Sequence, residues 1–195
     1  GYHPNHSLVG DAGAVLAALD AELAGLDVRS SGGAEVVGRV RQRVAERLAD
    51  LAAVTEPPLS SVSALTAVRE ALPEEAIVSS DVGGFRTWTF LPGVFDMTDA
   101  RRQLNPGSWG SMGTGLPAAI GAKAANPDTP VVALVGDGGL LMAVHELHTA
   151  AREDLPVVVV VLNNDDWAII THGASTRGID RGTWAWPGTP VDFAT

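Results

Sequence analysis

The chain has 195 residues, and 46% of them are hydrophobic, which is enough apolar side chain for the core of a domain. Thirteen basic residues face 23 acidic ones, and the net charge of −10 argues against nucleic acid as a partner, because binding phosphates needs a basic surface. The absence of cysteine excludes disulfides and thiol chemistry, and no apolar run reaches the roughly 18 residues of a membrane span, so we expect a soluble cytoplasmic protein.

The N-terminal part reads as two helices joined by a linker. The first residues lead into a helical pattern (AGAVLAALDAELAGL) without an initiating methionine, which indicates a piece of a longer protein; the alternative is a lead-in that belongs to a short one. After a turn-rich linker over 27–33, residues 34–54 combine apolar helical spacing with charges of both signs, which predicts a surface helix rather than a membrane-bound one. Residues 55–58 (TEPP) break it, and we place the domain boundary there, between 1–55 and 56–195.

The second predicted domain begins with a helix and a strand. Ser60 or Ser61 can cap a helix that runs through Ala71, and a strand is expected at 76–79. Two segments rich in small residues follow.

The first of these segments is the turn 81–84 (DVGG), directly after the strand, and the second is 105–113 (NPGSWGSMG), which precedes a predicted helix over 114–125. Small residues allow the backbone to come close to a flat ring. Both segments are therefore candidate ligand contacts.

The stretch from residue 131 to residue 170 has the pattern of a βαβ unit. Apolar runs at 131–135 (VVALV) and 157–162 (VVVVVL) flank a segment of helical period, from Leu140 to about Glu153. Such β-branched runs predict strands buried on both faces of a parallel sheet, and a right-handed crossover puts both strand ends at one edge. The expected fold class is α/β, with a doubly wound parallel sheet flanked by helices.

Polar side chains follow both strands of this unit. Asp137 comes after the first strand and Asn164 ends the second, so a carboxylate and an amide oxygen should meet at the carboxyl edge, where open α/β folds bind ligands. Glycines at 136, 138 and 139 would let main-chain N–H groups approach an anion. With a carbonyl from residues 165–166, these groups could hold Mg²⁺ together with a diphosphate.

The spacing of these residues resembles a known family. GDG at 136–138 and NN at 163–164, separated by the 24 residues 139–162, look like the signature of thiamine-diphosphate-dependent enzymes. GDG alone would more often be a plain turn between a strand and a helix. The pairing with NN, with a strand before each, makes the resemblance specific.

The resemblance implies thiamine diphosphate and Mg²⁺ as cofactors. In this family the residues at Asp137 and Asn164 ligate the metal through their side chains, and the one at Asp166 through its main-chain oxygen. Gly138 and Gly139 would donate N–H groups to the diphosphate. The family often has Ser where Gly139 stands, so one hydroxyl contact is expected to be missing.

The resemblance extends to the two segments rich in small residues. Gly84 and Phe85 would offer backbone groups to the diphosphate, although the family commonly has His or Asn at Phe85. Residues 110–112 match the family's aminopyrimidine loop. The Gly110 carbonyl would accept a hydrogen bond from the cofactor's amine, and the Met112 N–H would face a ring nitrogen. The Met112 side chain would separate the two rings of the cofactor. Ser111, between these two residues in the chain, is also expected at the cofactor.

Other matching positions depart from the family pattern. Trp167 and Ala168 replace its usual residue-glycine pair, and the tryptophan typical of the synthase has its counterpart at Gly173. Ala168 and Ile169 are still expected beside the cofactor, with an aliphatic wall toward the substrate. The remainder, from Thr171 onward, is expected to be a mobile loop.

The nearest resemblance is to acetohydroxyacid (acetolactate) synthase and related 2-oxo-acid carboligases and decarboxylases, whose central domain ends like residues 1–27. In these enzymes a glutamate of a separate pyrimidine-binding domain activates the cofactor. The resemblance therefore implies a 2-oxo-acid substrate, a pyrimidine-binding domain in the same or another chain, and a homo-oligomer. It implies no catalytic residue within this chain, which should bind the cofactor weakly and not turn over.

Two alternatives stay open. The chain could be the small subunit of a two-subunit 2-oxo-acid decarboxylase, or a non-catalytic nucleotide-binding domain. Dinucleotide binding is disfavoured, because GDGGLL lacks the last glycine of GxGxxG.

Overall fold

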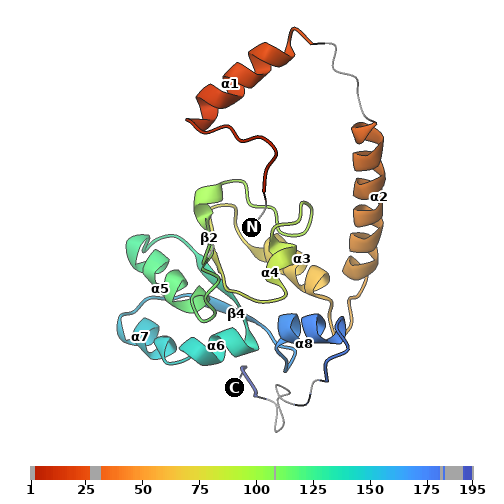
Figure 1. Cartoon of the computed structure of the whole chain (residues 1–195). Helices are drawn as coiled ribbons and strands as arrows, with labels where there is room; N and C mark the ends of the chain where they lie inside the picture. The colour runs from red at the N-terminus through yellow and green to blue at the C-terminus, as the bar shows by residue number, and fades with distance from the viewer. Residues whose placement is uncertain (1–2, 27–31, 108, 181, 183–190, 195) are drawn as a thin grey trace. The chain divides into compact units, whose positions relative to one another are not determined.

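The computed structural model describes residues 3–26, 32–107, 109–180, 182 and 191–194 (Figure 1). The chain divides into two compact units, Gly1–Ala45 and Glu46–Thr195. The domain boundary predicted after residue 55 stays a prediction. Among the described residues, no helix is both long enough and apolar enough to cross a membrane.

The first unit is helical. Helix α1 spans Ala12–Leu23 and is capped by Asp11, whose carboxylate accepts a hydrogen bond of 3.0 Å from the Ala14 N–H. Residues 3–11 have no regular secondary structure. The predicted linker falls mainly on residues outside the described ones. Helix α2, Gly33–Ala52, begins in the first unit and ends in the second.

A parallel sheet forms the second unit. Its strands are β1 (Ile77–Ser80), β2 (Gln103–Leu104), β3 (Val131–Gly136) and β4 (Val158–Leu162), in the order β2-β1-β3-β4. Every pairing is parallel, so the carboxyl ends of the strands lie at one edge. The predicted parallel α/β sheet is confirmed.

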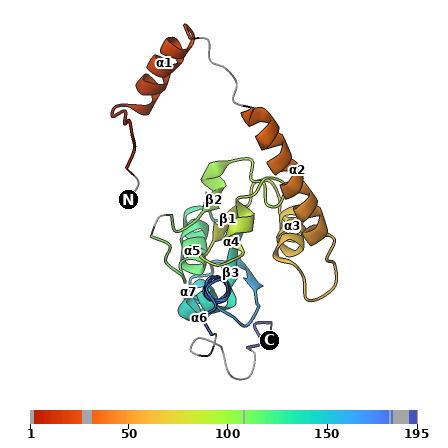
Figure 2. The ribbon, with the colours of Figure 1, turned by 45° about the vertical axis from the view of Figure 1, so that its right-hand side comes forward.

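Helices cover both faces of this sheet (Figures 1 and 2). They are α3 (Ser61–Ala71), α4 (Arg86–Thr89), α5 (Gly115–Ala125), α6 (Asp137–Ala143), α7 (Glu146–Arg152) and α8 (Ala168–Ser175). Side chains of β3 alternate between two buried clusters, with Val131, Ala133 and Val135 in one and Val132 and Leu134 in the other. The first cluster includes residues of α5, α6 and α7, and the second includes residues of α3.

Three elements differ from the sequence expectation. The helix expected from Leu140 to Glu153 is two helices, because the N–H groups of Leu147 and His148 bond three residues back and tighten the turn between α6 and α7. Strand β4 is not buried on both faces: among the described residues it lies at one edge of the sheet, and Val158 is 60% exposed. Thr171 lies inside helix α8 rather than in a loop, and residues 181, 183–190 and 195 of the expected loop lie outside the described residues.

Candidate functional site

A cavity of about 1140 Å³ lies at the carboxyl ends of the strands. Its walls come from the turns after β1, β3 and β4, from the segment before α5, and from α3 and α8. Most of the predicted site residues line it: Gly84, Phe85, Gly110, Met112, Asp137, Gly138, Gly139, Asn164, Asp166, Ala168 and Ile169. Ser111 does not line the cavity; its carbonyl accepts a hydrogen bond from the Thr114 hydroxyl.

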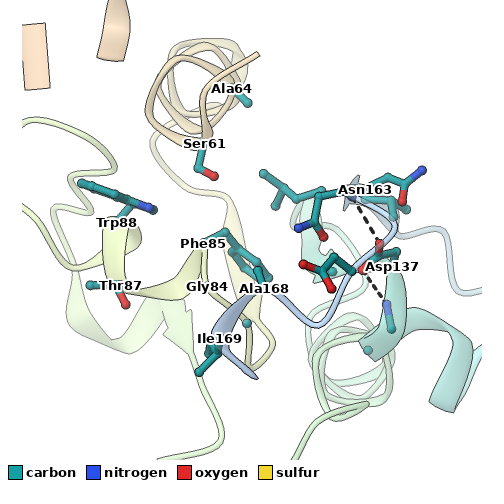
Figure 3. A pocket seen from close by; sticks show the side chains of 18 of the residues that line it. Ser61, Ala64, Gly84, Phe85, Thr87, Trp88, Asp137, Asn163, Ala168 and Ile169 are labelled. Atoms are coloured by element: carbon teal, nitrogen blue, oxygen red, sulfur yellow. Dashed lines mark hydrogen bonds between the residues drawn. The ribbon is translucent and has the colours of Figure 1, made fainter. Parts of the chain in front are cut away.

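Asp137 is the buried acid of this cavity, with 4% of its surface exposed. Its Oδ1 accepts from the Gly138 N–H at 2.8 Å, and its Oδ2 accepts from the Asn164 N–H at 3.2 Å (Figure 3). A carboxylate oxygen has a second acceptor position, so both oxygens can still take a ligand. The second bond joins the ends of β3 and β4, as the parallel topology predicts.

Asn164 and Asp166 complete this corner of the cavity. Asn164 is exposed, and the Asp166 side chain accepts a 2.8 Å hydrogen bond from the Thr171 hydroxyl at the start of α8. That bond uses a carboxylate oxygen of Asp166, and the metal-binding role of its main-chain carbonyl stays a prediction. Three oxygen groups thus come from two loops that meet at Asp137.

Close approaches explain the glycines of the turn after β3. A side-chain carbon at Gly138 would lie 2.5 Å from the Trp167 ring, and one at Gly139 would run into the Asp81 carboxylate. Neither contact is possible for an ordinary side chain. Gly139 therefore leaves no room for the serine of the family unless Asp81 shifts.

Phe85 is a core residue and not a polar contact. The residue is 6% exposed, and its ring packs under Gly83 and reaches toward Gly136 at the end of β3. Gly84 lies against the start of α8, because a side-chain carbon there would be 3.5 Å from the Ala168 Cβ and 3.9 Å from Ile169. Figure 3 shows these residues together on one side, with Asp137 on the other.

The segment before α5 adopts a conformation that favours glycine. Gly110 has a φ of 61° and Gly113 a φ of 77°, both in the left-handed region. Met112, between them, is half-buried and lines the cavity. Its wedge role between two rings stays a prediction.

Residues 81–195, more than half of the chain, match the family described as thiamine pyrophosphate enzyme, C-terminal TPP binding domain; thiamine pyrophosphate is thiamine diphosphate. The chain belongs to this family. The match confirms the resemblance stated from the signature, and it covers all the site residues named above.

Known proteins similar to this thiamine-pyrophosphate-binding domain include both synthases and decarboxylases. Acetolactate synthase isozyme 1 large subunit of Escherichia coli is 36% identical over 128 residues, 66% of this chain and 22% of that protein. The probable 2-ketoarginine decarboxylase of Pseudomonas aeruginosa is 38% identical over 162 residues, 82% of this chain and 27% of that protein.

A solved structure shares the fold. The thiamine diphosphate-dependent 4-hydroxybenzoylformate decarboxylase of Rhodococcus jostii RHA1 has a TM-score of 0.58 at 28% identity, covering 68% of this chain and 25% of that chain. The domain therefore spans between 22% and 27% of the length of these relatives.

Sequence reasoning missed two residues of the thiamine-pyrophosphate-binding domain. Asp81 is fully buried behind the cavity, and the only available signal was an acid directly after a strand, as at Asp137. Trp167 was noted as a departure from the family, but its packing on Gly138 had no signal in the sequence.

Proposed function

We propose that this domain binds the diphosphate of thiamine diphosphate through Mg²⁺, as the C-terminal part of an acetolactate-synthase-like enzyme that decarboxylates or ligates 2-oxo acids. The names of its relatives, an acetolactate synthase and a 2-ketoarginine decarboxylase, support that range. The observation that carries the proposal is the 3.2 Å hydrogen bond from the Asn164 N–H to Asp137, because it brings the two halves of the signature together.

The donor set fits a cation shared with a diphosphate. Mg²⁺ prefers six oxygen ligands and usually takes only a few from protein when phosphates and water supply the rest. The Asp137 carboxylate, the Asn164 side chain and the Asp166 carbonyl would be the protein's share. Within the described ranges, no group of three or more His, Cys, Asp or Glu gathers to hold a metal alone. These residues therefore do not form a metal site made of protein side chains alone.

The remaining cavity residues would bind and orient the cofactor. Gly138 and Gly139 would direct N–H groups to the diphosphate, and the backbone of Gly84 and Phe85 would support it from the turn after β1. Thiamine diphosphate, when bound, supplies the carbanion chemistry, and the protein supplies binding and electrostatics.

The other half of the site would come from a pyrimidine-binding domain, in the same or another chain, with its activating glutamate. The full assembly would then be a homo-oligomer whose partner faces the cavity opening. On this proposal, residues 1–195 alone bind the cofactor weakly and do not decarboxylate 2-oxo acids.

Calorimetry with thiamine diphosphate, with and without Mg²⁺, tests the proposal. We expect the wild-type chain to bind only when Mg²⁺ is present, and Asp137→Ala to lose binding, because the metal loses its buried carboxylate. Asp128→Ala, which removes an exposed acid that does not line the cavity, is the matched control and should bind like wild type.

Two results would contradict the proposed binding of thiamine diphosphate through Mg²⁺. One is cofactor binding of equal strength without Mg²⁺ or in Asp137→Ala, with circular dichroism showing that both proteins are folded. The other is tighter binding of ATP or NAD than of thiamine diphosphate, which would favour a nucleotide-binding domain. Rapid decarboxylation of a 2-oxo acid by the purified chain would refute the need for a second domain.

A further inference from the structure

A second buried acid lies behind the cavity. Asp81 follows β1 and has no exposed surface. Its Oδ1 accepts from the Val82 N–H at 2.7 Å and from the Thr114 N–H at 3.3 Å, and its Oδ2 accepts from the Gly113 N–H at 2.9 Å. The Thr114 hydroxyl also lies 3.4 Å from Oδ1. Main-chain donors from two distant segments thus converge on one carboxylate.

The same carboxylate touches a third segment. A side-chain carbon at Gly139 would run into its Oδ2, and one at Gly115 would lie 2.7 Å from the Asp81 Cβ. Asp81 does not line the cavity itself, whereas Gly110 and Met112 do. Asp81 therefore lies where the turn after β1, the segment before α5 and the turn after β3 meet.

Burying the Asp81 carboxylate costs free energy, and the positions of its hydrogen-bond donors offer a reason for that cost. A buried carboxylate loses its hydration, and the hydrogen bonds from surrounding N–H groups must replace it. An apolar residue could fill the same space without that cost, but it could not hold the N–H groups of Gly113 and Thr114 in fixed places. No ion pair to Asp81 is found in the described part of the chain, so its partners there are main-chain N–H groups and the Thr114 hydroxyl.

We propose that Asp81 is a positioning residue that holds segment 110–113 at a set distance from the diphosphate corner, so that the ring end of thiamine diphosphate fits. The inference rests on the proposed function, because it assigns the ring to this segment and the diphosphate to Asp137. It goes beyond that function by assigning the fit of the ring to a residue that does not touch the cofactor.

The test compares two probes of the same site. Thiamine diphosphate with Mg²⁺ reports on both ends of the cavity, and inorganic pyrophosphate with Mg²⁺ reports on the Asp137 corner alone. Asp81→Asn keeps the size of the side chain but turns one oxygen into an amide nitrogen that faces an N–H donor. We expect binding of thiamine diphosphate to weaken about tenfold, since a hydrogen bond to a charged group is lost.

Pyrophosphate binding should stay within about twofold of wild type, because the hydrogen bonds that Asp137 accepts from Gly138 and Asn164 do not involve Asp81. Asp128→Asn, the matched exposed acid, should alter neither ligand. Amide hydrogen exchange gives a second readout: in Asp81→Asn it should speed up at Gly113 and Thr114 while β3 stays protected.

The outcomes separate this inference from the proposed function. If wild type fails to bind thiamine diphosphate, the proposed function is overturned and this inference with it. If wild type binds it but Asp81→Asn weakens both ligands equally, or neither, the inference alone is overturned, since a general loss of folding or no role would explain the result.

Discussion

The contact between Gly138 and Trp167 allows a quantitative test of the site's packing. In Gly138→Ala the new Cβ would lie 2.5 Å from the indole, and the ring would have to withdraw to about 3.4 Å, where contacts become ordinary. Overpacking of this kind costs about 1–3 kcal/mol. Because Gly138 lies in helix α6, alanine also gains up to about 1 kcal/mol of helix propensity. We expect a net destabilisation of about 1–2 kcal/mol.

A double-mutant cycle isolates this contact. In Trp167→Ala the space beside Gly138 is open, so adding Gly138→Ala should be neutral or stabilising by up to about 1 kcal/mol. The expected coupling energy is therefore about 2 kcal/mol. The assay is urea unfolding of the four proteins, followed by far-ultraviolet circular dichroism.

The change in unfolding free energy that Gly138→Ala causes in the Trp167→Ala protein tests whether the indole limits the space at Gly138. If Gly138→Ala destabilises that protein as much as it destabilises wild type, the indole does not limit the space at Gly138. The packing described for the turn after β3 would then be wrong.

Two further predictions concern the wall of the cavity formed by α3 and the turn after β1. Ser60 caps α3 by accepting a hydrogen bond of 2.9 Å from the Ser63 N–H, and its hydroxyl also donates to the Leu51 carbonyl. Ser60→Ala should therefore lower the free energy of unfolding by about 1 kcal/mol, whereas Ser60→Thr, which keeps the hydroxyl, should lose less than half of that. Equal losses in urea unfolding would exclude the cap as the cause. Phe85→His introduces a residue common in the family, but the position is buried among apolar side chains. We expect a loss of about 2 kcal/mol in urea unfolding and no gain in cofactor affinity by calorimetry. Tighter cofactor binding would show that the imidazole makes a polar contact with the cofactor.

The part of the site that could be predicted from the sequence depends on neighbouring strands. Asp137 and Asn164 follow two apolar runs joined by a helix, and parallel topology alone places their ends together. The capping of α3 by Ser60 was equally local, since its partner is three residues away. Local pattern and a single topological rule were sufficient in both cases.

The part that could not be predicted depends on contacts between distant segments. Asp81 meets Gly113 and Thr114 across 32 and 33 residues, and no periodicity or spacing encodes that approach. Strand β2 has only two residues, Gln103 and Leu104, too few for any pattern, and it exists because β1 offers an edge to pair with. The valines of β4 indicate a strand, but they do not tell whether a further strand covers it.

The position of β4 at the edge of the sheet links cofactor capture to folding. Asn164 reaches Asp137 only when β4 is paired with β3, and in the described structure β4 is paired on that one side. A ligand that requires both residues therefore binds the folded chain and not the unfolded one, and mass action must raise the melting temperature as its concentration rises. The vitamin-derived cofactor would then act as a folding ligand for an edge strand of the sheet.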